Sequence, residues 1–223
     1  MSLPVPVSME GNIGAGKSTL LSVIASAMAA EVSVVPEPIA DWTGPAAELN
    51  GDAPLDRLYA DEAAYGRAFQ MYALATKLEA AGHAVEAARF SGSGVLLYER
   101  CPLDQDVFPT LNRRRGIFND FDALAFRRMQ DAVGAAMPAA APRHHIYLRV
   151  DPYECARRTE QRGRGSEDGI SAERFLELHA IHEAWMASLP AERVLVLDGH
   201  AEPESHLPRL AAFFKTIRSP GRG

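Results

Sequence analysis

A glycine-rich segment near the N-terminus constrains the fold of this chain more than any other feature. Residues 11–18 read GNIGAGKS, a full match to the pattern GxxxxGK[ST]. The apolar run Val5–Met9 precedes this segment, and the residues after it have helical periodicity. The apolar stripe of that helix consists of Leu20, Leu21, Ile24 and Met28. Because strand, glycine loop and helix occur in this order, we predict a phosphate-binding loop (P-loop) here.

Each residue type in the loop has a physical role. Glycines permit the tight turn that points backbone N–H groups inward, and the following helix adds its positive N-terminal end. We expect Lys17 to reach the β- and γ-phosphates of ATP and the Ser18 hydroxyl to bind Mg²⁺. The predicted ATP-binding residues in the loop are Gly11, Asn12, Ile13, Gly14, Ala15, Gly16, Lys17, Ser18 and Thr19.

Short apolar runs alternate with longer helical segments along the whole chain. The predicted strands are Val5–Met9, Val32–Val35, Val95–Tyr98, Ile146–Val150 and Val194–Leu197. Asn119 is a candidate cap for a helix through about Met137, and Ser171 is one for a helix with an apolar stripe. Residues 36–54, rich in Pro, Gly, Asp and Ala, are expected to be irregular. Strands that alternate with helices pair in parallel, so we predict an α/β sheet covered on both faces.

Composition limits the classes of protein that the chain can belong to. Its 223 residues, 47% of them apolar, suffice for one sizeable core, so we predict one domain over residues 1–218 and a tail over 219–223. The net charge of −6 and the lack of a long apolar run argue against nucleic-acid and membrane partners. Two cysteines, Cys101 and Cys155, exclude a disulfide framework. We expect a reducing compartment, the cytoplasm by default, with a mitochondrial or viral origin left open.

Candidates for the acceptor side of a phosphate transfer follow two of the predicted strands. Glu37 follows the second strand, where α/β sheets bind ligands, and is placed to accept a proton from an attacking hydroxyl. Glu99 and Arg100 end the third strand, so we expect Glu99 near the metal and Arg100 near the reacting groups. Because neighbouring strand residues face opposite sides, both can point into one site only if the strand has already ended.

A third candidate segment is rich in arginine although the protein as a whole is acidic. Residues 157–164 contain four arginines, of which Arg158 and Arg162 share a helix face and Arg164 stands between two glycines. Such a segment can close over a triphosphate and neutralise the charge of the transition state. We predict an arginine-rich lid over about residues 157–170, although each of these charged segments, taken singly, is also compatible with a solvated surface.

Together these segments resemble the deoxynucleoside kinase family, which includes deoxycytidine, deoxyguanosine and mitochondrial thymidine kinases and, more distantly, herpesvirus thymidine kinase. The resemblance extends from Val5 to about Leu197. Its landmarks occur in family order: GNIGAGKST at 11–19, a PEP-x-x-x-W type element at 36–42, FQ-x-Y at 69–72, ERC at 99–101, the lid at 157–170 and LH-x-x-HE-x-W at 178–185. The family commonly has ERS in place of ERC.

The resemblance implies a P-loop NTPase fold with a five-stranded parallel sheet, and a homodimer that forms through helices. It also implies Mg²⁺-dependent transfer of the γ-phosphate of ATP to the 5′-hydroxyl of a deoxynucleoside, a step in deoxynucleotide salvage. By matching position, Glu37 resembles the general base and Arg100 its partner, while Glu99 resembles the residue that holds Mg²⁺ through water, next to Ser18. The other implied catalytic residues are Lys17, Arg158 and Arg162.

The implied binding residues extend along much of the chain. Those for the deoxynucleoside are Glu37, Trp42, Tyr59, Phe69, Gln70, Lys77, Arg100, Asp104 and Glu167, and those for ATP outside the P-loop are Arg158, Arg162 and Arg164. Gln70 resembles the residue that reads the base edge, and its amide offers both a donor and an acceptor. Tyr59 and Glu167 resemble the pair that binds the sugar 3′-hydroxyl, which would orient the 5′-oxygen toward Glu37.

Two departures from the family leave the preferred base open. Cys101 replaces the usual serine, and the segment 102–108 is one residue shorter, so either Asp104 or Gln105 lies opposite Lys77. A Lys77–Asp104 pair would resemble the charged pair of deoxycytidine and deoxyguanosine kinases. The arginine run at 113–115 has no family counterpart, and we expect it to be a solvated loop.

Two other functions share part of this pattern. Thymidylate kinase and other nucleoside monophosphate kinases have a P-loop and an arginine-rich lid, but they need arginines for the acceptor phosphate and no general base, so Glu37 argues against them. A nucleotide-dependent switch or binding module would share only the P-loop. The sequence has no NKxD-like segment that would read guanine, and this alternative leaves the acceptor-side residues unexplained.

Overall fold

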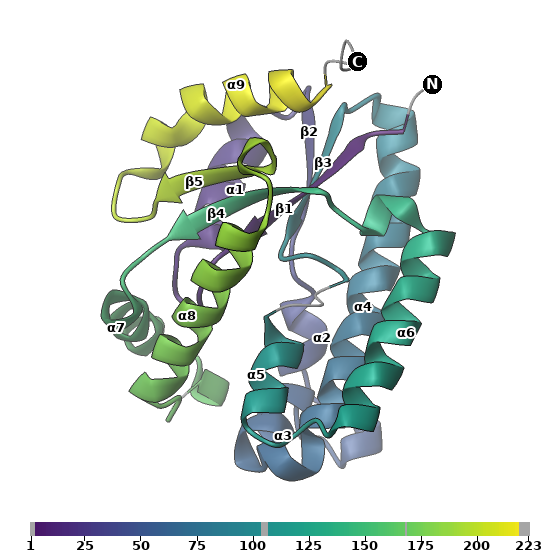
Figure 1. Cartoon of the computed structure of the whole chain (residues 1–223), viewed down its shortest axis with the longest axis vertical. Helices are drawn as coiled ribbons and strands as arrows, with labels where there is room; N and C mark the ends of the chain where they lie inside the picture. Colours follow the sequence, from purple (N-terminus) through teal and green to yellow (C-terminus); the bar gives the residue numbers. More distant parts are fainter. Residues whose placement is uncertain (1–2, 104–106, 168, 219–223) are drawn as a thin grey trace.

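A computed structural model describes residues 3–103, 107–167 and 169–218 of the chain. Within these ranges five parallel strands form one sheet in the order β2-β3-β1-β4-β5 (Figure 1). The strands are β1 (Val5–Glu10), β2 (Val32–Val35), β3 (Val95–Glu99), β4 (His144–Arg149) and β5 (Val194–Asp198). The predicted five-stranded α/β sheet is therefore confirmed. The predicted tail at 219–223 lies outside the described residues.

The helices start and end largely where the sequence has cap signals. They are α1 (Lys17–Ala27), α2 (Ile39–Thr43), α3 (Pro54–Ala60), α4 (Glu62–Ser91), α5 (Phe108–Arg114), α6 (Asp120–Ala136), α7 (Pro152–Arg162), α8 (Ala172–Ser188) and α9 (Leu207–Arg218). Asn119 forms a capping box with Asp122 at the start of α6. The Ser171 hydroxyl accepts a hydrogen bond from the Arg174 N–H at the start of α8. Both predicted caps are thus confirmed.

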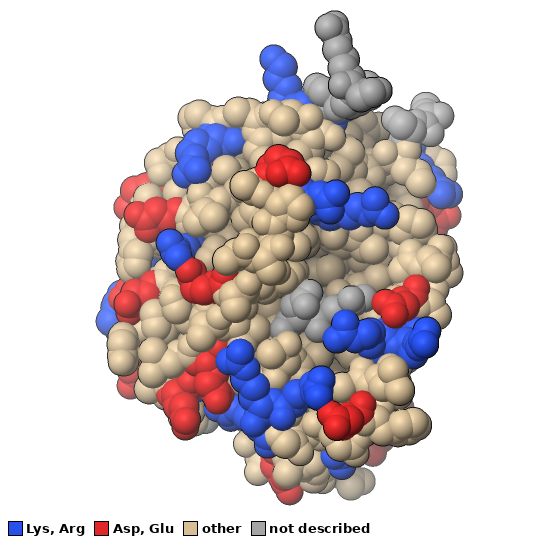
Figure 2. All heavy atoms as spheres, in the orientation of Figure 1, with Lys and Arg blue, Asp and Glu red and all other residues tan. Residues whose placement is uncertain are grey.

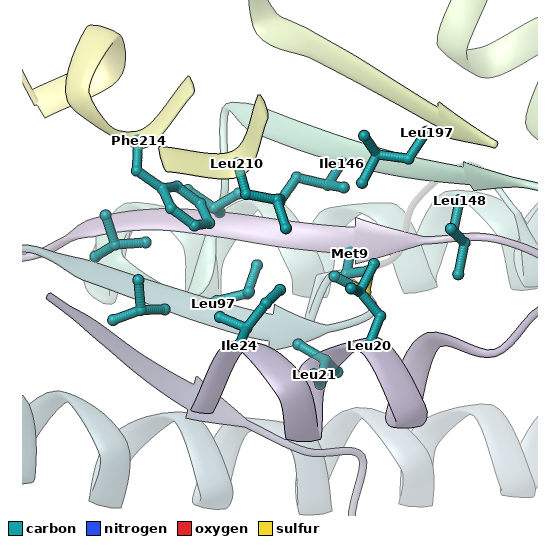
Figure 3. Close-up of a cluster of buried hydrophobic side chains, with 13 residues drawn as sticks. Met9, Leu20, Leu21, Ile24, Leu97, Ile146, Leu148, Leu197, Leu210 and Phe214 are labelled. Atoms are coloured by element: carbon teal, nitrogen blue, oxygen red, sulfur yellow. The ribbon is translucent and has the colours of Figure 1, made fainter. Parts of the chain in front are cut away.

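Every residue of β3 is buried, because helices cover both faces of the sheet. Val95 and Leu97 belong to a core shared with α1 and α9, and Figure 3 shows this core between the strands and the two helices. Leu96 and Tyr98 point the other way, into a core that includes Ala81 of α4. Residues 95–98 of β3 are all apolar because both sides of the strand pack against helices. This uninterrupted apolar run made the strand recognisable from sequence.

Polar residues start β4 two positions earlier than predicted. His144 already pairs with Val7 of β1, and the strand ends at Arg149 rather than Val150. The buried His145 ring is accommodated because its Nδ1 lies 2.9 Å from the Ser8 hydroxyl. A search for apolar runs misses such a strand start.

The segment at 36–54 is more regular than predicted. It contains α2 and the short 3₁₀ helix η1 (Ala47–Leu49). Trp42 is the reason: its ring is buried with Leu55 and Leu58, and its Nε1–H donates to the Thr76 hydroxyl at 3.0 Å. Tertiary burial therefore stabilises a helix too short to be stable from propensity alone.

The arginine run at 113–115 is solvated at Arg113 and Arg114, as predicted, but it forms the end of a helix and not a loop. Arg113 and Arg114 end α5, and Arg115 caps it while pairing with Glu62 and Glu177. Cations at a helix C-terminus interact favourably with the helix dipole, so these arginines stabilise the end of α5. Figure 2 shows basic side chains gathered, with acidic ones beside them, over the part of this face where Figure 1 places α5 and α6.

The register of the sheet brings the carboxyl ends of three strands together. Met9 of β1 is level with Glu99 of β3, and Val35, the last residue of β2, is level with Tyr98 of β3. The P-loop, the turn after β2 and Arg100 therefore lie along one edge of the sheet, where parallel sheets bind ligands. In the part of the chain that the structure describes, no helix is long and apolar enough to cross a bilayer.

Candidate active site

The P-loop has a backbone conformation that only glycine adopts without strain. Gly14 and Gly16 have φ angles of 73° and 93°. A Cβ on Gly14 would lie 2.4 Å from the Cys155 carbonyl oxygen in α7, so α7 packs directly on the loop. Asn12 turns away from the site, and its amide donates to the Phe175 carbonyl oxygen at 2.9 Å. The loop is thus fixed by α7 and α8 before any ligand binds.

Lys17 and Ser18 begin α1 at the floor of the site. The Lys17 ammonium donates to the carbonyl oxygens of Gly11 (3.1 Å) and Asn12 (2.8 Å). Burial, together with the charge of Arg100, lowers the pKa of Lys17 to about 8, although nearby carboxylates raise it. The Ser18 hydroxyl donates to Glu99 Oε1 at 2.7 Å. The two predicted metal ligands are therefore neighbours in the fold.

Glu37 lies between two cations at the edge of the sheet. Its Oε1 is 3.3 Å from Arg100 Nε and 3.6 Å from Lys77 Nζ, and all three side chains are nearly buried. Burial alone would raise the pKa of the Glu37 carboxyl, but Arg100, Lys77 and Lys17 outweigh it and the pKa is lowered. Glu37 is therefore a carboxylate at neutral pH and can accept a proton.

Arg100 lies just beyond the end of β3, as is required for Glu99 and Arg100 to point into the same site. β3 ends at Glu99, and Arg100 adopts a left-handed φ of 62°, which is uncommon for a residue with a side chain. Its guanidinium lies over the Phe108 ring, with Cζ 5.1 Å from the centroid. Because the strand has ended, Glu99 and Arg100 both line the same cavity. Such strained backbone often occurs at functional sites.

A cavity of about 360 Å³ unites the donor and acceptor halves of the predicted site. Its lining includes the predicted residues Ile13, Gly14, Ala15, Gly16, Lys17, Ser18, Thr19, Glu37, Trp42, Tyr59, Phe69, Gln70, Lys77, Glu99, Arg100, Arg158, Arg162, Arg164 and Glu167. Trp42 and Phe69 form an edge-to-face pair with ring centroids 5.8 Å apart, and Lys77 Nζ lies 5.7 Å from the Trp42 ring. Beside these rings the lining carries the amide of Gln70.

Tyr59 and the lid form another part of the same cavity. α3 packs against the short 3₁₀ helix η3 (Gly165–Glu167), which brings Tyr59 near Glu167. Glu167 pairs with Arg162 at 2.5 Å and with Arg164 at 3.6 Å. Burial raises the pKa of Tyr59 to about 12, so its hydroxyl keeps its proton and can donate. We call this part the sugar end, after the predicted roles of Tyr59 and Glu167.

Arg158 separates this cavity from a second one of about 320 Å³. Its guanidinium donates to the Gly199 carbonyl oxygen at 3.0 Å, in the loop after β5, and pairs with Glu154 at 2.7 Å. Gly16, Thr19 and Arg158 line both cavities. The second cavity lies beside the P-loop, on the side of the loop after β5, and no sequence pattern predicted it.

Two predicted residues are not part of the lining, and a third is not described. Gly11 and Asn12 belong to the loop but do not line the cavity, and Asp104 lies outside the described residues, as does Gln105. The predicted Lys77–Asp104 pair is thus not described, whereas Lys77 pairs with Glu37. Among histidine, cysteine and acidic side chains of the described residues, no group of three could hold a metal ion.

The structure adds cavity residues that the sequence analysis missed, among them Phe108, Asn112, Phe126, Gln130 and Arg174. Phe108 and Asn112 are four residues apart and share one face of α5. Arg174 is four residues before Leu178, on the buried stripe of α8. The sequence signal for Arg174 was a charged residue at a position of the helix where apolar residues are expected. This signal indicates a site only when the buried face of the helix is known to face a cavity.

Comparison with known proteins gives a consistent result. The family model described as "Deoxynucleoside kinase" matches residues 7–213. Thymidine kinase of Ictalurid herpesvirus 1 (strain Auburn) is 32% identical over 205 residues, which cover 91% of this chain and 82% of that protein. Deoxycytidine kinase 1 of Xenopus laevis is 30% identical, over 81% of this chain and 73% of its own. Mitochondrial thymidine kinase 2 of Homo sapiens is 28% identical, over 95% and 76%.

These matches span both halves of the site, from β1 to α9, and agree with the landmarks found in the sequence. A P-loop alone would match many unrelated phosphate-binding proteins, whereas this match also includes the acceptor-side residues Glu37, Gln70 and Arg100. The chain belongs to the deoxynucleoside kinase family.

Proposed function

We propose that this deoxynucleoside kinase transfers the γ-phosphate of ATP directly to the 5′-hydroxyl of a 2′-deoxynucleoside, with Glu37 as the general base. The observation that carries the proposal is the single cavity lined by both the P-loop and the Glu37–Arg100–Lys77 cluster. A phosphate donor on Lys17 and an acceptor hydroxyl at Glu37 would meet inside it. Positioning supplies most of the rate acceleration in phosphoryl transfer.

The transfer would be a single in-line displacement. The 5′-oxygen attacks the γ-phosphorus, its proton passes to the Glu37 carboxylate, and the bond between the γ-phosphorus and the bridging oxygen breaks to release ADP. Arg100 holds Glu37 and keeps its pKa low, so the base is ionised before the acceptor arrives. Lys17 and the lid arginines Arg158 and Arg162 would stabilise the charge on the transferred group.

The residues at the P-loop suit a magnesium ion. Ser18 Oγ and Glu99 Oε1, 2.7 Å apart, are hard oxygen donors beside the predicted phosphate site. Mg²⁺ usually keeps several waters and binds through one or two protein oxygens plus phosphates, so a larger protein cluster is not required. When bound, the ion would neutralise charge on the β- and γ-phosphates.

The two cavities suggest where each substrate lies. The donor phosphates on the P-loop leave the second cavity, beside Gly16 and Arg158, for the donor's base. In the first cavity, Gln70 would read the acceptor base, while Tyr59 and Glu167 would donate to and accept from the sugar 3′-hydroxyl. Glu167 pairs with the lid arginines Arg162 and Arg164. When the substrates bind, Glu167 would turn part of its hydrogen bonding to the 3′-hydroxyl, and the arginines would turn to the phosphates.

We also propose that two copies associate through helices. Phe121, Leu124 and Met129 of α6 are exposed, and Phe121 and Leu124, three residues apart, are neighbours on its surface, which is typical of a contact surface. The mass of the protein in solution tests this: a mass of one chain at all concentrations would contradict it.

A panel of acceptors combined with one substitution tests the reaction. Thymidine, deoxycytidine, deoxyguanosine and deoxyadenosine are compared with their 5′-monophosphates, and at least one nucleoside is expected to be the better acceptor. Glu37→Gln should lower kcat by about 10³ with little change in KM, because it removes the base but keeps the shape. The control is Glu48→Gln, an exposed glutamate that lines neither cavity. Turnover of monophosphates alone, or an unchanged kcat in Glu37→Gln, would contradict the proposal.

A further inference from the structure

The sugar end of the cavity contains a buried cation to which none of the roles above applies. Arg174 lies in the first turn of α8, its side chain is 6% exposed, and it lines the cavity. Its Cζ lies 5.4 Å from the centroid of the Tyr59 ring. Tyr59 and Glu167 belong to the same part of the cavity. The guanidinium therefore lies against Tyr59, one of the two residues predicted to hold the 3′-hydroxyl.

The fold satisfies this guanidinium only in part. Arg174 Nη1 donates to Glu62 in α4, whereas its buried Nε has no hydrogen-bond partner among residues 3–103, 107–167 and 169–218. Glu62 is shared, because Arg115 also pairs with it, at 3.5 Å. Arg115 has a second partner, Glu177, at 2.8 Å. Buried polar groups in proteins are normally hydrogen-bonded, and an exception calls for a reason. A role in the cavity is such a reason.

Arg174 belongs to a partly buried charge network of two arginines and two carboxylates, with Arg115, Glu62 and Glu177. Arg174 and Arg115 compete for the single carboxylate of Glu62, and Glu177 pairs with Arg115 alone among the contacts of this group. A buried positive charge keeps a strong field in a low-dielectric wall. It favours an electron-rich oxygen nearby and holds the Tyr59 ring, on which the guanidinium lies.

We propose that Arg174 is the positioning residue for the sugar 3′-oxygen, and that it makes the enzyme select acceptors that carry this oxygen. The inference rests on the proposed function. The 3′-oxygen would accept from the Tyr59 hydroxyl while its proton points to Glu167. Arg174 acts through Tyr59, which it keeps in place, and through its charge, which stabilises the oxygen in that orientation.

The test compares a 2′-deoxynucleoside with its 2′,3′-dideoxy analogue, which lacks only the 3′-oxygen. Arg174→Met should lower kcat/KM for the deoxynucleoside by roughly tenfold or more and leave the dideoxy analogue within about threefold, because a site built around a hydroxyl loses its advantage when that arrangement is lost. Arg174→Lys restores the charge and should recover part of the discrimination. Equal losses on the two acceptors, or no recovery with lysine, would overturn the proposal.

Arg115→Met is the matched control. It removes the other arginine on Glu62 but does not line the cavity, so its losses should be the same for both acceptors. An equally large loss of discrimination in this variant would assign the effect to the network and overturn the role of Arg174. Thermal unfolding checks that each variant is folded, and Arg174→Gln replaces the methionine variant, with the same expected outcomes, if that one is not. A wild-type enzyme that phosphorylates no deoxynucleoside would defeat the proposed function instead.

Discussion

The donor half and the acceptor half of the site are built in different ways. The donor half is built around the continuous segment 11–19, whose shape is set by backbone angles and by the packing of α7 and α8. The acceptor half takes its side chains from several separate elements: the turns after β2 and β3, the helices α3 and α4, and η3. One half is therefore local in the chain, and the other depends on the tertiary fold.

This difference predicts how each half tolerates change. A backbone cradle depends on glycine angles and is insensitive to most distant substitutions, whereas side chains from several elements respond to any shift between those elements. The two halves meet where the charge of Lys17 acts on Glu37. Substitutions on either side of this contact can show whether donor and acceptor are functionally separate.

The largest effect is expected from Lys17→Met. Loss of the ammonium should lower kcat by about 10³, because it removes a charge aimed at the transferred phosphate. The substitution should leave the affinity for the deoxynucleoside, measured by calorimetry without ATP, within about threefold. If Lys17→Met weakened the binding of the deoxynucleoside as much as it weakened the binding of ATP, the two halves would form a single binding unit. That result would contradict the division into a donor half and an acceptor half.

A smaller effect is expected from the lid, which touches both halves. Arg162→Ala should lower kcat by about 10² with little change in deoxynucleoside affinity, as expected for charge stabilisation confined to the transition state. Arg157→Ala is the control, since Arg157 is exposed, pairs with Glu154 and lines neither cavity. An unchanged kcat in Arg162→Ala would leave Arg162 as merely the surface partner of Glu167.

The same contrast explains what sequence could predict. The P-loop was predictable because its residues are consecutive and their spacing is the signal. The direction of Arg100 was not, because it depends on β3 ending at Glu99, and single-sequence patterns do not fix an element's last residue. Helix α2 was missed because a buried tryptophan stabilises it. Arg174 and Asn112 were missed because only the tertiary fold shows which helix faces meet at the cavity.

The smallest expected effect is a pH dependence that separates the two halves. Burial lowers the pKa of Lys17 to about 8, and the protonated ammonium is the form that binds phosphate. With Mg²⁺ saturating, kcat/KM for ATP should therefore fall as pH rises through about 8, by about tenfold for each further pH unit. Because a bound phosphate favours the charged amine, kcat should stay level over the same range.

On the acceptor side the sign is opposite and the window is different. The three cations around Glu37 outweigh its burial and lower its pKa, so the carboxylate is lost only under acidic conditions. At saturating ATP, kcat/KM for the deoxynucleoside should hence be level from about pH 6 to pH 9. A level profile for ATP up to pH 9.5 would mean that Lys17 keeps its proton despite burial, and a fall in both profiles together would mean that one titrating group serves both halves.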